Sequence, residues 1–538
     1  MIGCLGILFP LFVQLLVDNL LTPGYSQLLI SLIIAVIILM FFRGGLELIQ
    51  SQLMAHFAQR VQLGLVMEFG RNLLRLPLNF YETHQTGDVI SRLKDVRELH
   101  QLITGGVINF PSQFFIMLSS LGFMLIYSFP VTIVAGILFL MTLIFALIPV
   151  QVLQVKNQNL FVYESQVQSL LSEIFQESIS LKASGLISQF WQELQSRLGR
   201  IANVAYRWHQ WQIFQQVFLQ FSRNLSSLIL LGLGSQGVVN QSLSLGQLLG
   251  IVLLYQNWQN CAEELVKLRV NLGKVKLVTK RLTEIIERRP ETQGDYQKPT
   301  VQIPGRADII ASDITFYYPG RVNVLDNFSV RVPGGKIVAL IGESGCGKST
   351  LAKLMAGLYP LTGVNLRIGI YNLPGIPLDC LRKQVVFVPS ETQFWSRSIL
   401  DNLRLTNPEL SFQEVVLACQ ITGADEFISQ LPEKYQTQLH ELGYNLSTGQ
   451  RQQLAIARGI VNDPPVLILD ESTAYLDGKA ESQLLEQLFY QRQDKTTLVI
   501  THKPQVIRRA DWVIWLEKGQ VKMAGTPEEL RMFISHVY

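Results

Sequence analysis

The feature that most constrains this chain is a series of long apolar stretches in its first half. Six of them cover residues 2–21, 26–48, 106–128, 130–153, 213–235 and 245–265. Each has about the 20 residues that a helix needs to cross the hydrocarbon core of a membrane. Buried helices of a soluble domain are the alternative, but stretches of this length with this pattern of charges favour six membrane-spanning helices.

The charges between the stretches predict their orientation. The connections after the first, third and fifth stretches are short, and Asp18 is the only charge near them. The other connections are long and rich in Arg and Lys, as in 60–97 and 156–207. Basic residues gather on the cytoplasmic side of membrane proteins. We therefore expect a multi-pass protein of the cytoplasmic membrane, with both termini in the cytoplasm.

The start of the chain is unusual, because the first stretch begins at Met1 without a basic flank. A signal peptide is the rival interpretation. It would need a positively charged segment and a small-residue cleavage site, and neither is present. We expect that the chain starts late, so that the first helix is short or lacks its cytoplasmic end.

Composition supports a membrane protein and argues against some other classes. Of the 538 residues, 48% are apolar and 16% are charged, whereas an average soluble chain has about 25% charged residues. The net charge of +4 is small for this length, so we expect no nucleic-acid partner. The five cysteines lack zinc or redox spacing, which is typical of reduced cysteines.

The composition and the hydrophobic pattern of the chain change near residue 290. Beyond it, short apolar runs alternate with Gly/Pro turns and helical patterns, which is typical of an α/β domain. The segment 289–306 is rich in Pro, Gly, Gln and Thr and is predicted to be a linker. We therefore predict a multi-domain protein with an all-α transmembrane domain over 1–288 and an α/β domain over 307–538.

A phosphate-binding motif follows the strand pattern Lys336–Ile341 and precedes a helical pattern at Leu351–Leu358. In the motif G-x-x-x-x-G-K-[ST], glycines let backbone N–H groups surround phosphates. The lysine reaches the β- and γ-phosphates, and the hydroxyl ligates Mg²⁺. We expect ATP and Mg²⁺ as cofactors. The predicted loop residues are Gly342, Glu343, Ser344, Gly345, Cys346, Gly347, Lys348, Ser349 and Thr350.

Two more strand patterns end in polar residues. The strand 465–469 runs into Asp470 and Glu471. We predict that Asp470 holds Mg²⁺ through water and that Glu471 polarises the attacking water. The strand 498–501 ends at His502, which would lie beside the phosphate-loop strand and contact the γ-phosphate. The alternatives are a capping role for Asp470 and a structural one for His502.

The segment Leu446–Arg458 has the sequence of a family signature. With the strand that ends in Asp-Glu, it resembles the signature of ATP-binding cassette (ABC) transporters. The resemblance covers essentially the whole chain, and the membrane part is similar to type I exporters through Phe80–Leu93 and Leu245–Leu248. Tyr81–Gly105 most resembles exporters of peptides and bacteriocins. Some of those have an N-terminal peptidase domain, which we do not expect here.

The resemblance implies further roles. Tyr318 has the place of the aromatic residue that stacks on adenine. Ser447 and Gly449, with Gln450, lie where the signature forms an anion site at a helix N-terminus. In the family this site closes on the ATP of a second chain, so two chains are needed. We expect a homodimer in the lipid bilayer, with a heterodimer as the alternative. The family's contact segments correspond to Gly87–Arg92, Glu173–Lys182, Glu441–Gly443 and Ala474–Asp477.

Two positions depart from the family pattern. Thr448 replaces the usual glycine of the signature, and we expect a mild effect. Ser390 replaces a glutamine that reaches Mg²⁺ and the attacking water. Serine is shorter and would act only through an added water. The departure indicates one of two things. Either the substitution is tolerated with, at most, modestly slower ATP hydrolysis, or the chain is a catalytically weak subunit whose partner has the more competent site.

The predicted function is ATP-hydrolysis-driven export of a substrate by alternating access, with the chain as an ABC-type ATPase and half-transporter. We expect a peptide substrate; a lipid or hydrophobic drug is the alternative. A polar cavity would favour a peptide and an aromatic, apolar one a lipid or drug. Polar residues in the last two stretches line a pathway or join helices. They are Gln215, Gln216, Gln220, Arg223, Asn224, Gln256, Asn257, Gln259, Asn260, Glu263 and Glu264.

Overall fold

A computed structural model describes most of the chain. The described residues are 7–20, 26–84, 109–148, 150–318, 323–360, 365–440 and 443–534, with Gly87, Val89, Arg92, Leu93 and Val96. The chain divides into two compact units, which are treated separately below. The first comprises Met1–Leu76 and Phe80–Arg288, and the second Pro77–Asn79 and Arg289–Tyr538.

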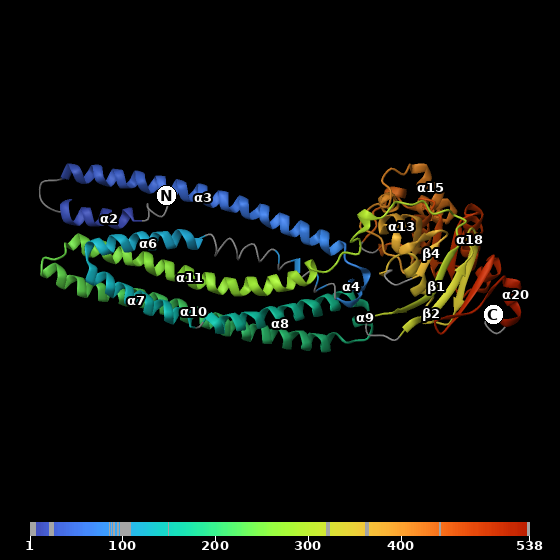
Figure 1. Cartoon of the computed structure of the whole chain (residues 1–538), viewed down its shortest axis with the longest axis horizontal. Coiled ribbons are helices and arrows are strands. Elements are labelled where there is room, and N and C mark those ends of the chain that lie inside the picture. The colour runs from blue at the N-terminus through green and yellow to red at the C-terminus, as the bar shows by residue number, and fades with distance from the viewer. Residues whose placement is uncertain are drawn as a thin grey trace. The chain divides into compact units, whose positions relative to one another are not determined.

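The first unit is built from helices whose axes lie roughly along a common line (Figure 1). Three are very long: α3 (Ser26–Leu74), α10 (Ile187–Val239) and α11 (Leu245–Ile286) have 49, 53 and 42 residues. At 1.5 Å per residue they measure roughly 60–80 Å, about twice the hydrocarbon core of a membrane. These three helices are therefore longer than a single crossing of the hydrocarbon core requires.

The other described helices of this half are shorter. They are α2 (Leu8–Leu15), the π-helix η1 (Leu16–Leu20), α4 (Leu78–Thr83), α6 (Asn109–Tyr127), α7 (Phe129–Leu147), α8 (Val150–Gln176) and α9 (Ser178–Ala183).

Four described helices are long and apolar enough to cross a membrane. They are Ile33–Leu74, Phe110–Tyr127, Phe129–Leu147 and Ile187–Val239, and they overlap four of the six predicted stretches. The first stretch falls on the short α2 and η1. The sixth falls on α11, where amide side chains lower the apolarity. The described residues of these two stretches are helical, but the stretches differ from the others in length or polarity.

The surface of this unit is suited to lipid. The most apolar part of α3 has no buried residue, and Phe41 and Ile126 are 79% and 78% exposed. Exposed apolar surface on this scale is unusual in water. The interior is apolar as well, with Met124, Leu230 and Tyr255 fully buried. The helices therefore present apolar side chains both inward and outward, as lipid-embedded helices do.

The second unit has two sheets. The larger has the strand order β10-β9-β3-β8-β7-β6, in which β10 is antiparallel and the others are parallel. The smaller is antiparallel, with the order β2-β1-β4-β5. The strands are β1 (Ile309–Tyr317), β2 (Asn323–Val332), β3 (Ile337–Gly342), β4 (Asn365–Ile368), β5 (Tyr371–Asn372), β6 (Val385–Val388), β7 (Val466–Asp470), β8 (Thr496–Ile500), β9 (Trp512–Glu517) and β10 (Gln520–Gly525).

Helices and short 3₁₀ turns connect these strands. They are η3 (Asp295–Gln297), α12 (Lys348–Met355), η4 (Leu373–Gly375), α13 (Leu378–Gln384), α14 (Ile399–Arg404), α15 (Phe412–Ile421), α16 (Ala424–Gln430), η5 (Lys434–Gln436), α17 (Thr448–Ile460), α18 (Gly478–Gln491), α19 (Pro504–Arg509) and α20 (Pro527–Ile534).

The parallel sheet confirms the predicted α/β organisation. The strand patterns that precede Gly342, Asp470 and His502 became β3, β7 and β8, with ends within a few residues of those predicted. β8 pairs in parallel with both β3 and β7, so the His502 strand lies beside the phosphate-loop strand, as predicted. Since parallel strands end at the same edge, the polar residues that follow them are neighbours.

Candidate nucleotide site

The loop between β3 and α12 can be formed only with glycine at two positions. Gly342 and Gly347 have φ values of 147° and 103°, which other residues rarely adopt. A Cβ atom would lie 2.2 Å from the Leu516 oxygen at Gly342, and 2.7 Å from a Leu325 methyl at Gly347. Glu343, Ser344 and Gly345 are exposed between them, while Cys346 is buried, which raises the pKa of its thiol.

Lys348 begins α12 and is only 6% exposed. Its Nζ donates to the Gly342 oxygen at 2.7 Å and the Glu343 oxygen at 2.8 Å. The ammonium group therefore lies within the curve of the loop, where the helix N-terminus also favours an anion. This arrangement provides a positive, hydrogen-bond-donating surface that fits phosphate groups.

Ser349 and Asp470 meet beside the loop. The Ser349 Oγ donates to Asp470 Oδ1 at 3.0 Å. Burial raises the pKa of Asp470, and the hydrogen bond from Ser349 partly offsets this. A hydroxyl and a carboxylate together are the hard oxygen ligands that Mg²⁺ prefers, and a nearby cation would favour the ionised carboxylate. The residues present therefore fit a nucleotide with Mg²⁺.

Glu471 and His502 form a pair at the edge of the sheet. Glu471 Oε1 lies 3.2 Å from His502 Nε2, and the side chains are 41% and 52% exposed. The Glu471 N–H donates to the Ile500 oxygen at 3.1 Å, yet its φ of 50° is left-handed. Such a conformation costs roughly 1–3 kcal/mol and is found preferentially at functional sites. The pair is therefore anchored to the sheet and accessible to water.

Tyr318 lies against the first turn of α12. Its hydroxyl is 3.1 Å from Thr350 Oγ1, and its ring makes edge-to-face contacts with Phe316 and Tyr359, at centroid distances of 5.3 and 5.4 Å. The structure thus brings Tyr318 to the end of the phosphate loop. The prediction that it stacks on adenine stays a prediction.

The signature residues begin α17. Ser447 Oγ accepts from the Gln450 N–H at 3.2 Å, and Gln450 Oε1 accepts from the Ser447 N–H at 2.9 Å. This capping box ties the Gln450 side chain to its own helix. Thr448 is exposed in the first turn and is not at a positive φ, so this position does not require the glycine usual in the family. A Cβ on Gly449 would lie 3.4 Å from the Tyr475 oxygen.

The loop and the signature belong to different hydrophobic cores of the same unit. Cys346 and Leu351 pack in one core, and Leu446 and Leu454 pack in another. Each motif therefore has its own support, which would allow the signature to act on a nucleotide other than the one in its own loop.

Ser390 follows β6 in a half-buried position. Its carbonyl oxygen accepts from Gln452 Nε2 at 3.5 Å. The hydrogen bond between Ser349 and Asp470 does not involve it. Nothing in this arrangement assigns Ser390 a direct metal contact.

Two residues near the site were missed from the sequence. Gln452 is buried, and its Oε1 accepts from the Tyr475 N–H at 3.0 Å. Lys503 Nζ donates to the Thr473 oxygen at 2.8 Å and to Glu481 Oε2 at 2.9 Å. Both hold the segment that follows Glu471. Lys503 directly follows His502, but the sequence does not show that its side chain turns inward.

The predicted contact segments are only partly described. Of these segments, residues 88, 90, 91, 441 and 442 lie outside the described residues. Arg92, at the end of the first predicted segment, donates to the Arg281 oxygen at 3.3 Å and lies 3.7 Å from the Glu284 carboxylate. This part of the segment is therefore fixed to α11.

The fold and the site together define a class: a membrane protein with an attached nucleotide-binding α/β domain. The family model described as "ABC transporter" matches residues 325–474, and that described as "ABC transporter transmembrane region" matches residues 1–258. The chain belongs to the ABC transporter family and is an exporter half-transporter, an ATPase coupled to transport.

Similar proteins agree with this assignment. The lactococcin-G-processing and transport ATP-binding protein LagD of Lactococcus lactis subsp. lactis is 29% identical over 98% of this chain and 74% of its own length. The alpha-hemolysin translocation ATP-binding protein HlyB of Escherichia coli is 28% identical over the same shares. The structure of a bacterial Atm1-family ABC exporter with ATP bound matches with a TM-score of 0.86 and 20% identity, over 99% of this chain and 95% of that one. This likeness shows that the chain has the type I exporter fold.

Proposed function

We propose that this protein exports a peptide across the cytoplasmic membrane by ATP-driven alternating access, as one half of a dimer whose termini and ATPase domains are cytoplasmic. LagD, named for lactococcin G transport, and HlyB, named for alpha-hemolysin translocation, support this cargo class. A homodimer is the simplest assembly, because one chain carries one phosphate loop and one signature.

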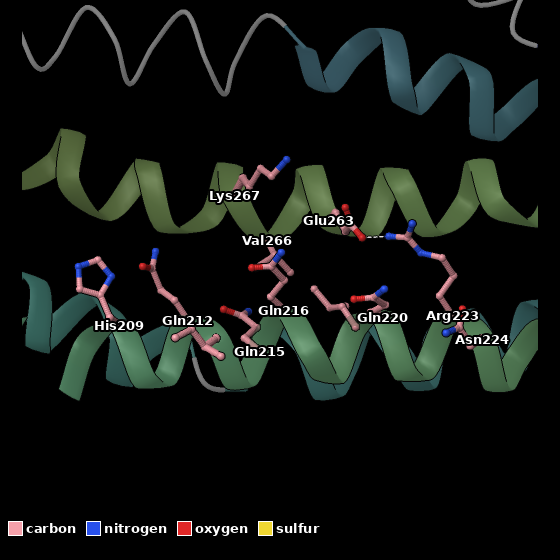
Figure 2. Close-up of a pocket in the computed structure, with 12 residues that line it drawn as sticks. His209, Gln212, Gln215, Gln216, Gln220, Arg223, Asn224, Glu263, Val266 and Lys267 are labelled. Carbon is pink, nitrogen blue, oxygen red and sulfur yellow. Dashed lines mark ion pairs between the residues drawn. The ribbon is translucent and has the colours of Figure 1, made fainter. Parts of the chain in front are cut away.

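The observation that carries the proposal of a peptide is a polar cavity between α10 and α11. Its volume is about 780 Å³, within the range of ligand sites. Nine of its twelve lining residues are polar or charged, and the other three are Ile213, Leu219 and Val266. Arg223 and Glu263 form an ion pair within it (Figure 2). Polar side chains inside a membrane domain mark a substrate pathway. A lipid or hydrophobic drug would fit an apolar lining better.

The proposed roles at the nucleotide site are supported by the geometry of the phosphate loop and by the family resemblance. Residues 342–350 surround the phosphates, with Lys348 turning its ammonium group toward them, and Tyr318 stacks on the base. Ser349 and Asp470 would hold Mg²⁺, which would supply charge neutralisation for the phosphates. Ser447 and Gly449 of the second chain close the site.

Glu471 and His502 are the proposed catalytic pair. The Glu471 carboxylate orients the attacking water and accepts its proton. His502, 3.2 Å away, holds that carboxylate in place and contacts the γ-phosphate. Closure of the two chains over ATP would turn the cavity from the cytoplasm to the outside, and hydrolysis would reset it.

The test is ATPase activity of the chain alone in lipid vesicles, with peptides, lipids and drugs added separately. We expect stimulation by peptides. Stimulation only by lipids or drugs would contradict the cargo, and activity without a second kind of chain would support the homodimer.

A second candidate is a catalytically weak subunit of a heterodimer. Ser390 favours it, because serine cannot reach the metal as the family's glutamine does. A basal ATPase rate near zero for the chain alone, restored by Ser390→Gln, would support this candidate. A substantial basal rate would exclude it.

A further inference from the structure

α10 presents three different sets of side chains, and two of these sets are rows with a spacing of four residues. Gln215, Leu219 and Ser226 are buried against the helix bundle. Ile213, Val217 and Phe221 form an apolar row that is about 60% exposed. Between these two faces lie Gln212, Gln216, Gln220 and Asn224, here called the amide row, all of which line the cavity.

The amide row differs in its hydrogen bonding from three other membrane amides, Gln215, Asn257 and Gln259. Gln215 Nε2 donates to the Ala146 oxygen at 2.9 Å, Asn257 Nδ2 donates to Ser120 Oγ at 3.1 Å, and Gln259 Nε2 donates to the Tyr255 hydroxyl at 2.6 Å. These three join or brace helices. No member of the amide row has a hydrogen bond to any described residue. Amides left without partners at membrane depth are costly unless water or a ligand satisfies them.

We infer that the amide row binds an extended segment of the cargo peptide through its backbone. Four residues of helix rise by about 6 Å, and two residues of an extended chain advance by about 6.6–6.8 Å. The mismatch is under 1 Å per step, which flexible glutamine side chains can absorb. The row spans about 18 Å, or five to six extended residues. A primary amide both donates and accepts, as does each backbone residue along one edge of a strand. This inference rests on the proposed peptide cargo.

The charges around the cavity make this site tolerant of sequence. Arg223 pairs with Glu263, and Lys267 Nζ pairs with Glu264 Oε1 at 2.7 Å. The cationic side chains of Arg223 and Lys267 are thus already matched, and the exposed groups of the row are neutral. Figure 2 shows Gln212, Gln216 and Gln220 on the α10 side of the cavity, with the Arg223 pair at one end. Neutral amides recognise a backbone and discriminate little between cargo side chains.

The first test leaves the protein unchanged. Synthetic 20-residue peptides that stimulate the ATPase in lipid vesicles are compared with a scrambled version and with one methylated at alternate backbone nitrogens. We expect the scrambled peptide to act at a similar concentration. Methylation should raise the half-maximal concentration by about tenfold, since it removes the donors. Equal action of the methylated peptide, or loss of action on scrambling, would overturn the inference.

The second test changes the row. Gln216→Leu removes an amide of the row, and Gln210→Leu is the matched control, because Gln210 is exposed on the same helix but is not a residue of the cavity lining. We expect the half-maximal peptide concentration to rise several-fold for Gln216→Leu and to stay the same for Gln210→Leu. Equal effects of the two variants would contradict the role of the row.

A third measurement separates a peptide from a second copy of the chain as the occupant. Gln216→Cys should react with a water-soluble maleimide in vesicles, above the background of the unmodified protein, and peptide should protect it. A Gln216→Cys that does not react without peptide would show that the row is covered by the partner chain, which overturns the inference. If no peptide stimulates even the unmodified protein, the proposed cargo itself fails, and the inference fails with it.

Discussion

The nucleotide site and the membrane cavity differ in how their polar groups are satisfied. At the nucleotide site Lys348, Ser349 and Glu471 already have partners within about 3 Å. In the cavity the amide row has none among the described residues. A preorganised site favours one ligand, because little rearrangement is needed. An open row of neutral amides can accept many sequences. Under the proposed function, the molecule would combine a preorganised nucleotide site with a cargo site that accepts many sequences.

The largest effect is expected from Glu471→Gln, which tests whether Glu471 of the nucleotide site is the general base for ATP hydrolysis. Loss of the proton acceptor should lower the ATPase rate by about 10²–10⁴-fold, while ATP stays bound and the dimer closed. The measurement is steady-state ATPase together with retention of labelled ATP. Glu486→Gln, at an exposed position of α18, is the control. Rapid turnover of Glu471→Gln would show that another group is the base.

The next largest effect is expected from Gly347→Ala. The left-handed φ of 103° and the 2.7 Å approach of a Leu325 methyl leave no room for a Cβ, so the loop should shift. We expect ATP affinity to fall by about tenfold or more, measured by nucleotide titration. Gly478→Ala is the matched control, since a Cβ there meets nothing within 4 Å. Unchanged affinity would mean that the loop is not preorganised.

Ser390→Gln should have a smaller effect, and it tests whether the nucleotide site is fully competent with serine at this position. A longer amide can reach the metal and the water directly. We expect the ATPase rate to rise by a few-fold with little change in ATP affinity, measured by steady-state kinetics. No increase in the ATPase rate would indicate that serine at position 390 is a tolerated substitution.

The smallest effect is expected from Asn257→Leu, which removes an amide that already has a partner. Loss of its 3.1 Å hydrogen bond to Ser120 should lower stability by about 1 kcal/mol. The half-maximal peptide concentration should stay the same. Thermal unfolding in detergent measures the stability, and peptide-stimulated ATPase activity measures the half-maximal peptide concentration. A shift in the peptide response would place Asn257 in the cargo site and weaken the contrast between α10 and α11.

The two regions also differ in how far the sequence could predict them. The glycines before Lys348 and the strands before Asp470 and His502 have strict spacing, so the parallel sheet and its polar edge could be predicted. The inward turn of Lys503 and the left-handed φ of Glu471 could not, because they depend on tertiary contacts. The membrane stretches were recognisable by length, but the sequence left open whether their amides join helices or line a pathway. Packing separates Gln259, which has a hydrogen bond within the bundle, from Gln216, which has none to the residues that the structure describes.

The most direct test of peptide export is uptake by vesicles that contain only this chain, with the nucleotide site facing outward. We predict that a fluorescent 20-residue peptide that stimulates the ATPase accumulates inside the vesicles only with ATP and Mg²⁺. Glu471→Gln should abolish the uptake. If the peptide does not accumulate while a labelled lipid crosses the bilayer in an ATP-dependent way, peptide export is contradicted.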